Sequence, residues 1–184
     1  PIPGTEMTFD CDTLLLSVGL LPENELTRAA GITLDPRTRG AVVYENMETS
    51  MPGVFACGNV VHVHDLVDYV TGESQKAGAA AAHFVQNGET PDGRVLELKN
   101  GDRVTYTVPQ KLRLSGMDRS VGIFFRVSNI YRDVEIQVTD GKTVLCRFNR
   151  EHVAPGEMET ITLPKVLAEK AEGDTLTVQI VDKA

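Results

Sequence analysis

The residues with the most evident chemistry in this chain follow a short apolar run. Residues 54–57 are wholly apolar and predict a buried strand, and Gly58 and Asn59 come directly after it. In open α/β sheets, ligands bind where the carboxyl end of a strand meets the amino end of the next helix. Gly58 lets a ligand approach the backbone closely, and Asn59 offers an amide oxygen and an amide NH2 group. We therefore expect a ligand crevice at this strand end.

Two histidines lie a few residues further along a segment that reads as extended. His62 and His64 are two positions apart, so their side chains share one face, and Asp65 and Cys57 lie nearby. Imidazole, carboxylate and thiolate groups can together bind a metal ion. The alternative is a polar connection between strand and helix, which we favour because short motifs often match by chance. We predict no metal site, and we interpret Cys57 as a packing residue, because no base or second cysteine stands at a fixed spacing from it.

A helix is expected directly after this turn. Residues 66–86 predict a helix with one buried stripe, with apolar side chains at positions 66, 67, 70, 77, 81, 84 and 85. Asp65 is the expected N-cap, and Asn87 marks the expected end. Gly78 and the alanines after it make the middle of the helix narrow, so we expect another element to pack closely against it.

The segment before the turn predicts further parts of an α/β domain. Residues 13–19 form a continuous apolar run closed by glycine, which is typical of a parallel strand buried on both faces. Residues 6–9 and 41–44 predict two shorter strands. Asn24 is placed to cap a short helix over residues 25–30.

A period of two replaces the helical pattern from Val95 onward. Seven alternating strands are predicted, over residues 104–108, 111–114, 122–127, 134–138, 143–148, 159–163 and 175–181. Asp140 and Gly141 form a hairpin signal between two of them, and residues 166–171 predict a helical turn. Short strands at such regular spacing predict an all-β, immunoglobulin-like sandwich. We therefore expect an α/β segment over residues 1–93 and a β-sandwich domain over residues 94–184.

Composition narrows the class of protein. The chain has 184 residues, 41% of them hydrophobic, and a formal net charge of −8. The residues through Val95 include 13 acidic and 5 basic side chains, and the rest of the chain is balanced. Neither half has the basic stripe of a nucleic-acid-binding protein, and no apolar run is long enough for a membrane span. The three cysteines are far apart and odd in number, which predicts a cytoplasmic protein with reduced cysteines. They form no Cys-x-x-Cys pair, so no redox dithiol or zinc knuckle is expected.

Four motifs in one order resemble a known family. Residues 12–22, Asp-Thr-Leu-Leu-Leu-Ser-Val-Gly-Leu-Leu-Pro, resemble a segment of the FAD-dependent pyridine nucleotide-disulfide oxidoreductases. Residues 40–44, residues 49–59 and the alanine-rich helix then resemble the following strand, the second flavin motif and the helix of that family. The resemblance covers residues 6–88. The amino-acid sequence of residues 57–65 is most similar to the subgroup associated with glycerol-3-phosphate and opine dehydrogenases.

The resemblance implies a flavin role for particular residues. Asn59 takes the position of the acid that bonds a ribityl hydroxyl of FAD, and Gly58 allows the close approach. Val67 and Asp68, in the first helical turn, would direct their backbone amides at the flavin ring, where their partial positive charge stabilises the reduced form. The amide of Asn59 can still accept a hydrogen bond, but the charge-assisted bond of the acid is lost.

Two family features have no counterpart in these residues. The sequence has no G-x-G-x-x-G turn for the adenine dinucleotide and no redox cysteine pair. We therefore expect the chain to be the C-terminal part of an oxidoreductase that uses FAD and NAD(P), and to hold FAD weakly or not at all by itself. Expected partners are the missing N-terminal portion, a dehydrogenase subunit, or a second copy in a homodimer. The alternative is a non-catalytic module that docks a partner subunit.

Overall fold

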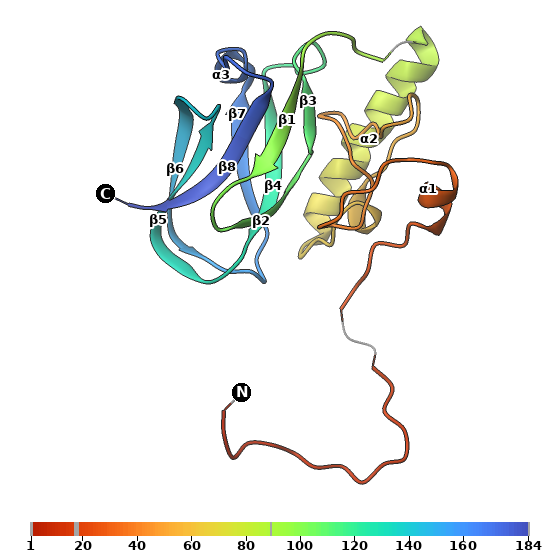
Figure 1. Cartoon of the computed structure of the whole chain (residues 1–184). Helices are drawn as coiled ribbons and strands as arrows, with labels where there is room; N and C mark the ends of the chain where they lie inside the picture. The colour runs from red at the N-terminus through yellow and green to blue at the C-terminus, as the bar shows by residue number, and fades with distance from the viewer. Residues whose placement is uncertain (1, 17–18, 89, 184) are drawn as a thin grey trace.

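The computed structural model describes residues 2–16, 19–88 and 90–183. A stretch without regular structure leads into a looped and helical segment, which packs against a β-rich segment (Figure 1). The first segment contains the short helix α1 (Glu25–Ala29), the 3-10 turn η1 (Gly58–Val60) and the long helix α2 (Val67–Asn87). No helix in these described ranges is both long and apolar enough to cross a membrane.

Helix α2 confirms the predicted helix, but not its predicted cap. Its last turn ends at Gly88, where a φ of 68° lets the Gly88 N–H donate to the Phe84 carbonyl at 2.7 Å. The N-cap position belongs to Leu66, and no side chain caps the helix there. Asp65 instead accepts hydrogen bonds from the Arg126 guanidinium and from the Met158 N–H. The N-cap prediction for Asp65 was wrong because partners in the β-rich segment engage its carboxylate.

Helix α1 also lies where the sequence predicted a helix, and again without the expected cap. Asn24 precedes it, but its side chain makes no capping hydrogen bond. Its amide donates to the carbonyls of Arg39 at 3.1 Å and Val60 at 2.9 Å. Asn24 therefore ties the α1 turn to the loops before α2.

The two strands predicted nearest the N-terminus are wrong for the residues that the structure describes. Residues 6–9 and 13–16 form no strand, and Leu15 is 87% exposed. Ser17 and Val18 of the predicted run lie outside the described residues. A parallel strand needs neighbours on its edges, and the described chain places none beside this stretch, which runs away from the body of the molecule in Figure 1.

The predicted strands at residues 41–44 and 54–57 become isolated bridges. Ala41 pairs with Leu34, Val43 with Thr49, and Phe55 with Glu48, all antiparallel. These residues are nonetheless packed, since Ala41 and Val43 are fully buried. The apolar pattern correctly marked core residues but not a continuous strand ladder.

The β-rich segment contains eight strands. They are β1 (Val95–Asn100), β2 (Val104–Val108), β3 (Lys111–Arg113), β4 (Ser120–Val127), β5 (Tyr131–Thr139), β6 (Val144–Val153), β7 (Glu159–Pro164) and β8 (Thr175–Asp182). A single helical turn, α3 (Lys165–Ala168), follows β7 where one was predicted. All seven predicted strands are present.

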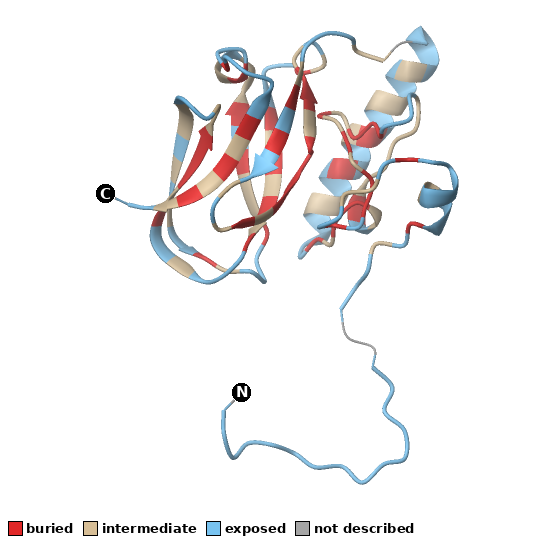
Figure 2. Ribbon diagram, viewed as in Figure 1, coloured by how far each residue is buried: buried red, intermediate tan, exposed pale blue. Residues whose placement is uncertain are grey.

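The strands form two sheets around a common core. One sheet has the order β3-β1-β8-β5-β6 and is mixed, because β1 pairs in parallel with β8. The other is antiparallel, with the order β2-β4-β7. Buried and less buried residues alternate along the strands (Figure 2), as expected when one face of each sheet meets the core. The immunoglobulin-like identity of this arrangement stays a prediction.

A second core joins the two segments of the chain. Its buried members are Ile32, Ala41, Val43, Met47, Val61, Ala77, Tyr106, Val108 and Met158. The strand β2 contributes to both cores because its register shifts between Val104 and Tyr106. Val104 packs between the sheets, whereas Tyr106 faces the segment that carries α2. The three-stranded sheet is therefore covered on both faces.

Candidate functional site

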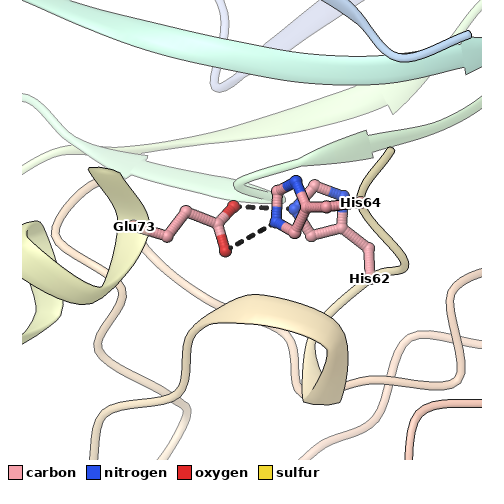
Figure 3. A group of neighbouring side chains, drawn as sticks. All are labelled: His62, His64 and Glu73. Atoms are coloured by element: carbon pink, nitrogen blue, oxygen red, sulfur yellow. Dashed lines mark hydrogen bonds and ion pairs between the residues drawn. The ribbon is translucent and has the colours of Figure 1, made fainter. Parts of the chain in front are cut away.

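A buried cluster of three polar side chains lies behind the predicted ligand-binding turn (Figure 3). His62 and His64 come from the loop after η1, and Glu73 comes from α2. His62 Nε2 lies 2.7 Å from Glu73 Oε1, and His64 Nε2 lies 3.0 Å from Glu73 Oε2. The Gly58 N–H donates to the same Oε2 at 2.8 Å. One carboxylate therefore links the glycine of the turn to both histidines.

Aromatic rings from both segments enclose this cluster. The His62 ring meets the Tyr106 ring edge-on at 5.9 Å between centroids, and the His64 ring meets Phe124 in the same way. Tyr69 of α2 packs against Phe124 at 5.4 Å. The cluster therefore depends on β2 and β4 of the β-rich segment as well as on α2.

Burial and hydrogen bonding set the charges of the cluster. Burial raises the pKa of the Glu73 carboxyl, but the interactions with His62 and His64 outweigh it and lower the pKa to about 2. Burial lowers the pKa of His62, against the opposing effect of Glu73. Glu73 is therefore ionised at neutral pH, while burial disfavours the cationic form of His62.

Of the four predicted flavin residues, three are exposed and one is buried. Gly58 is buried with a φ of 70°, and a Cβ there would lie 3.2 Å from Val70 Cγ1. Asn59 is exposed, and its Oδ1 accepts a hydrogen bond from the His64 N–H at 3.1 Å. Val67 and Asp68 are exposed in the first turn of α2, which packs against η1. The amide oxygen of Asn59 is thus already engaged by the loop that follows it.

The four residues considered as metal ligands are not brought together. Asp65 forms an ion pair with Arg126, and the Cys57 thiol lies 3.6 Å from the Ser74 hydroxyl. Cys57 is half-buried and packs against the second core, in keeping with the interpretation as a packing residue. The structure gathers only His62 and His64 of this set.

Glu73 was missed by the sequence analysis, although a signal for it exists. Val70, Glu73 and Ala77 are spaced by three and four residues, so Glu73 falls within the apolar stripe of α2. Its side chain is only 2% exposed. A charged residue inside a buried stripe needs a polar partner, and that need points to the nearby histidines.

A second buried polar cluster joins β3 to the loop after residue 44. Arg113 Nη1 donates to Glu48 Oε2 at 2.6 Å, Arg113 Nε to Glu45 Oε1 at 3.2 Å, and Nη2 to Asn46 Oδ1 at 2.7 Å. The guanidinium lies over the Tyr44 ring, 4.1 Å from its centroid. Burial raises the pKa of Glu45 in spite of Arg113. For Glu48, bonds from Gly53 and Arg113 overcome the effect of burial and lower the pKa.

A third polar contact holds the loop before α2. Arg126 of β4 pairs with Asp65, and its Nη2 donates to the Val63 carbonyl at 3.1 Å. Its Nε donates to the Tyr106 hydroxyl at 3.2 Å. The loop that carries both histidines is therefore fixed to the β-rich segment by charge as well as by packing.

A cavity of about 400 Å³ lies between α2 and the loop before β4. Lys76, His83 and Phe84 of α2 line it, opposite Gly116 and Asp118. Burial lowers the pKa of Lys76, against the opposing effect of Glu73. None of the four predicted flavin residues lines this cavity. Those residues therefore lie outside this cavity.

Comparison with known proteins relates the first segment to one family. Residues 2–83 match the model of the family described as pyridine nucleotide-disulphide oxidoreductase. The match ends near the end of α2 and does not reach the β-rich segment. The comparison supports this family for the segment that carries Gly58, Asn59, Val67 and Asp68.

Curated relatives agree with that assignment. The chain is 41% identical over 59 residues to a mitochondrial dihydrolipoyl dehydrogenase of Caenorhabditis elegans, which is 32% of this chain and 12% of the relative. It is 32% identical over 90 residues to the ferredoxin reductase component of chlorobenzene dioxygenase from Cupriavidus sp. (strain PS12), covering 45% and 21%. It is 35% identical over 66 residues to an NADH oxidase of Methanocaldococcus jannaschii, covering 35% and 13%.

These matches are partial. They span between about an eighth and about a fifth of the length of the three relatives. No solved structure matches the chain significantly.

Proposed function

We propose that this chain is the C-terminal part of an FAD-dependent oxidoreductase that transfers electrons between a pyridine nucleotide and an acceptor or partner dehydrogenase. The family match over residues 2–83 and the names of the relatives support this reaction class. The single structural observation that carries the proposal is the turn at Gly58 and Asn59, which Glu73 fixes beside the first turn of α2.

In this proposal, four residues form one edge of the flavin site. Asn59 meets a ribityl hydroxyl, using the amide group that remains exposed beside its bond to the His64 N–H. Gly58 keeps the backbone open for the ligand. Val67 and Asp68 present the amino end of α2, a helix of 21 residues, to the flavin ring. FAD supplies the electron-carrying chemistry when it is bound, and these residues position it.

We further propose a division of roles within the chain. Residues 1–93 are the closing segment of an FAD-binding domain, and residues 94–184 are an immunoglobulin-like domain of a cytoplasmic protein. The second core, which includes both Val61 and Tyr106, fits a β-domain that supports the flavin edge. The amino-acid sequence of residues 57–65 favours the subgroup associated with glycerol-3-phosphate and opine dehydrogenases.

The isolated chain is expected not to retain FAD or NAD(P). Its described residues offer one edge of a site, and the adenine dinucleotide needs the glycine-rich turn that these residues lack. Exposed leucines before residue 22, including Leu14, Leu15 and Leu16, provide apolar surface for an N-terminal portion of the parent or for a second copy.

A visible absorption spectrum tests this proposal. We expect the purified chain to be colourless after incubation with FAD and gel filtration. We expect flavin absorbance to return when the chain is mixed with an N-terminal piece of the parent that carries the glycine-rich turn. Retention of FAD by the chain alone, or failure of a complex that does form to bind FAD, would contradict it.

The alternative function is a non-catalytic module that docks a partner subunit of an oxidoreductase complex. The same exposed leucines favour it, because they provide contact surface and no reactive group. The two functions differ in one result. A docking module would form a stable complex with the N-terminal piece, yet that complex would bind no flavin and reduce no acceptor with NADH or NADPH.

A further inference from the structure

We propose that His62, His64 and Glu73 bind one divalent transition-metal ion, such as Zn²⁺ or Co²⁺, which ties helix α2 to the loop before it. This site is independent of the proposed flavin chemistry, because the ion would lie in the buried interior, behind the exposed Asn59. Its role is structural: it fixes the turn that presents Gly58.

The donor set suits such an ion. Each of the three residues offers one ligand atom, and these atoms all lie within 4.8 Å of one another. Two imidazoles with one carboxylate are ligands that Zn²⁺ and its neighbours accept, and the nitrogen donors disfavour Mg²⁺ and Ca²⁺. Figure 3 shows both rings directed at the carboxylate, so a single point between them can be reached by all three side chains.

Three buried ring nitrogens of the cluster have no hydrogen-bond partner in the described structure: His62 Nδ1, His64 Nδ1 and His64 Nε2. His64 Nε2 is buried and lies 3.0 Å from Glu73 Oε2, but the alignment is not that of a hydrogen bond. A buried polar atom without a bond costs free energy. A metal ion between His64 and Glu73 would use this lone pair. The unpartnered His64 Nε2, which faces the Glu73 carboxylate, is therefore the second observation, besides the donor set, that points to a ligand.

The charge of the cluster also favours a cation. Among the described residues, Glu73 forms ion-pair contacts only with the two histidines, whereas buried Glu45 and Glu48 share the guanidinium of Arg113. No arginine or lysine among these residues pairs with Glu73, and a divalent ion would give the buried carboxylate a cationic partner. The Gly58 N–H would remain on Glu73 Oε2 and orient the carboxylate, as groups behind metal ligands commonly do.

The geometry requires only a small rearrangement. With metal–ligand bonds of about 2.0–2.1 Å, tetrahedral ligand atoms stand about 3.4 Å apart. The observed separations are 2.7 Å between His62 and Glu73 and 3.0 Å between His64 and Glu73. Side-chain rotations of the two rings and the carboxylate would widen these distances by about half an ångström.

Metal loading of the purified chain tests the proposal. Because the cluster is buried, the chain is refolded with Zn²⁺ or Co²⁺, passed through gel filtration, and assayed by elemental mass spectrometry. We expect one ion per chain, a tetrahedral Co²⁺ absorption spectrum, and a higher melting temperature with metal than with a chelator. FAD is absent throughout, so the result does not depend on the flavin proposal.

Substitutions distinguish a metal site from a cluster that is held by hydrogen bonds alone. Glu73→Gln keeps an oxygen that accepts the Gly58 N–H but removes the charge, so we expect it to fold and to bind Co²⁺ at least about tenfold more weakly. His64→Asn should weaken binding similarly. His83→Asn and His152→Asn are matched controls outside the cluster, and their affinity should equal that of the wild type.

Two results would overturn the proposal. One is a wild-type chain that refolds to its native circular dichroism spectrum and carries no stoichiometric metal. The other is an affinity for Co²⁺ in folded Glu73→Gln and His64→Asn that equals that of the wild type. Either would show that Glu73 serves only as a hydrogen-bond acceptor for Gly58 and His62. If Glu73→Gln fails to fold, the His64→Asn variant and the metal stoichiometry of the wild type still decide whether the cluster binds a metal ion.

Discussion

Glu73 connects three parts of the chain through one side chain. Its carboxylate accepts bonds from the Gly58 N–H and the His62 ring, and it contacts His64. Its position in the apolar stripe of α2 places this charge in the interior. The site is therefore built by a residue whose charge is typical of the surface but whose place in the helical period is inside.

Gly58 is predicted to resist substitution for a conformational reason. Its φ of 70° strains any L side chain, and a Cβ would lie 3.2 Å from Val70. Gly58→Ala should lower the free energy of unfolding by about 1–3 kcal/mol. Gly78→Ala is the control, since nothing lies within 4 Å of that position in α2, and it should stabilise by about 0.5–1 kcal/mol. Urea unfolding measures the change in unfolding free energy for both variants. Equal changes in the two would contradict the conformational role given to Gly58.

The acid stability of the protein should depend on Glu48. Hydrogen bonds from Gly53 and Arg113 hold its folded-state pKa below the usual 4.5 in spite of burial. As the pH falls below about 4.5, the unfolded chain therefore binds more protons than the folded chain. The stabilisation that Glu48 contributes is lost in that range. Glu45 acts in the opposite direction, because burial raises its pKa.

Glu48→Gln isolates this effect. The fall in unfolding free energy between about pH 5 and pH 3 should be shallower in this variant than in the wild type, as measured by urea titration at each pH. Glu169→Gln, at an exposed position, should leave the slope unchanged. An unaltered slope in Glu48→Gln would mean that its ion pair with Arg113 is not formed in solution.

At the scale of elements, Arg113 is the main polar link between β3 and the loop after residue 44. Arg113→Met would leave Glu45 and Glu48 buried without their cation, which costs roughly 3–5 kcal/mol for a broken buried pair. Arg147→Met should cost less than about 1 kcal/mol, because its pair with Glu135 is half exposed. Chemical denaturation of both variants checks this. A small loss in Arg113→Met would show that the two segments do not dock through β3.

The sequence predicted elements well where the pattern was local. All seven strands from residue 104 onward, α1 and α2 are present, because alternation and helical spacing determine them within a few neighbours. β1 was not among the predicted strands, although Leu96 and Leu98 alternate with Glu97 and Lys99 as in a half-buried strand. Its parallel pairing with β8 joins residues far apart in the chain, and no local pattern encodes that.

The predictions that failed concern residues whose partners are distant. Residues 13–16 have the composition of a buried strand but no neighbouring strand among the described residues. Asp65 has the type and place of an N-cap, but Arg126 of β4 engages it. The candidate site was half predicted: the histidines were noted, whereas Glu73 was missed although its spacing from Val70 and Ala77 places it on the buried stripe of α2.

At the scale of the whole molecule, the N-terminal stretch carries exposed apolar surface. Leu14, Leu15 and Leu16 are 74%, 87% and 80% exposed. We expect the isolated chain to associate, and triple substitution of these leucines by serine to yield monomers in sedimentation velocity experiments. Val166→Ser, at an exposed position in α3, is the control and should not change the association. A monomeric wild type at high concentration would contradict this expectation.

The central claim is that this chain supplies the flavin-facing edge of a larger oxidoreductase. The most direct test is the ratio of FAD to protein in the purified full-length parent carrying Asn59→Leu. We predict a clearly lower ratio than in the wild type, with Asn149→Leu, at an exposed position of β6, unchanged. An FAD ratio and activity equal to the wild type in Asn59→Leu would contradict the assignment of this edge.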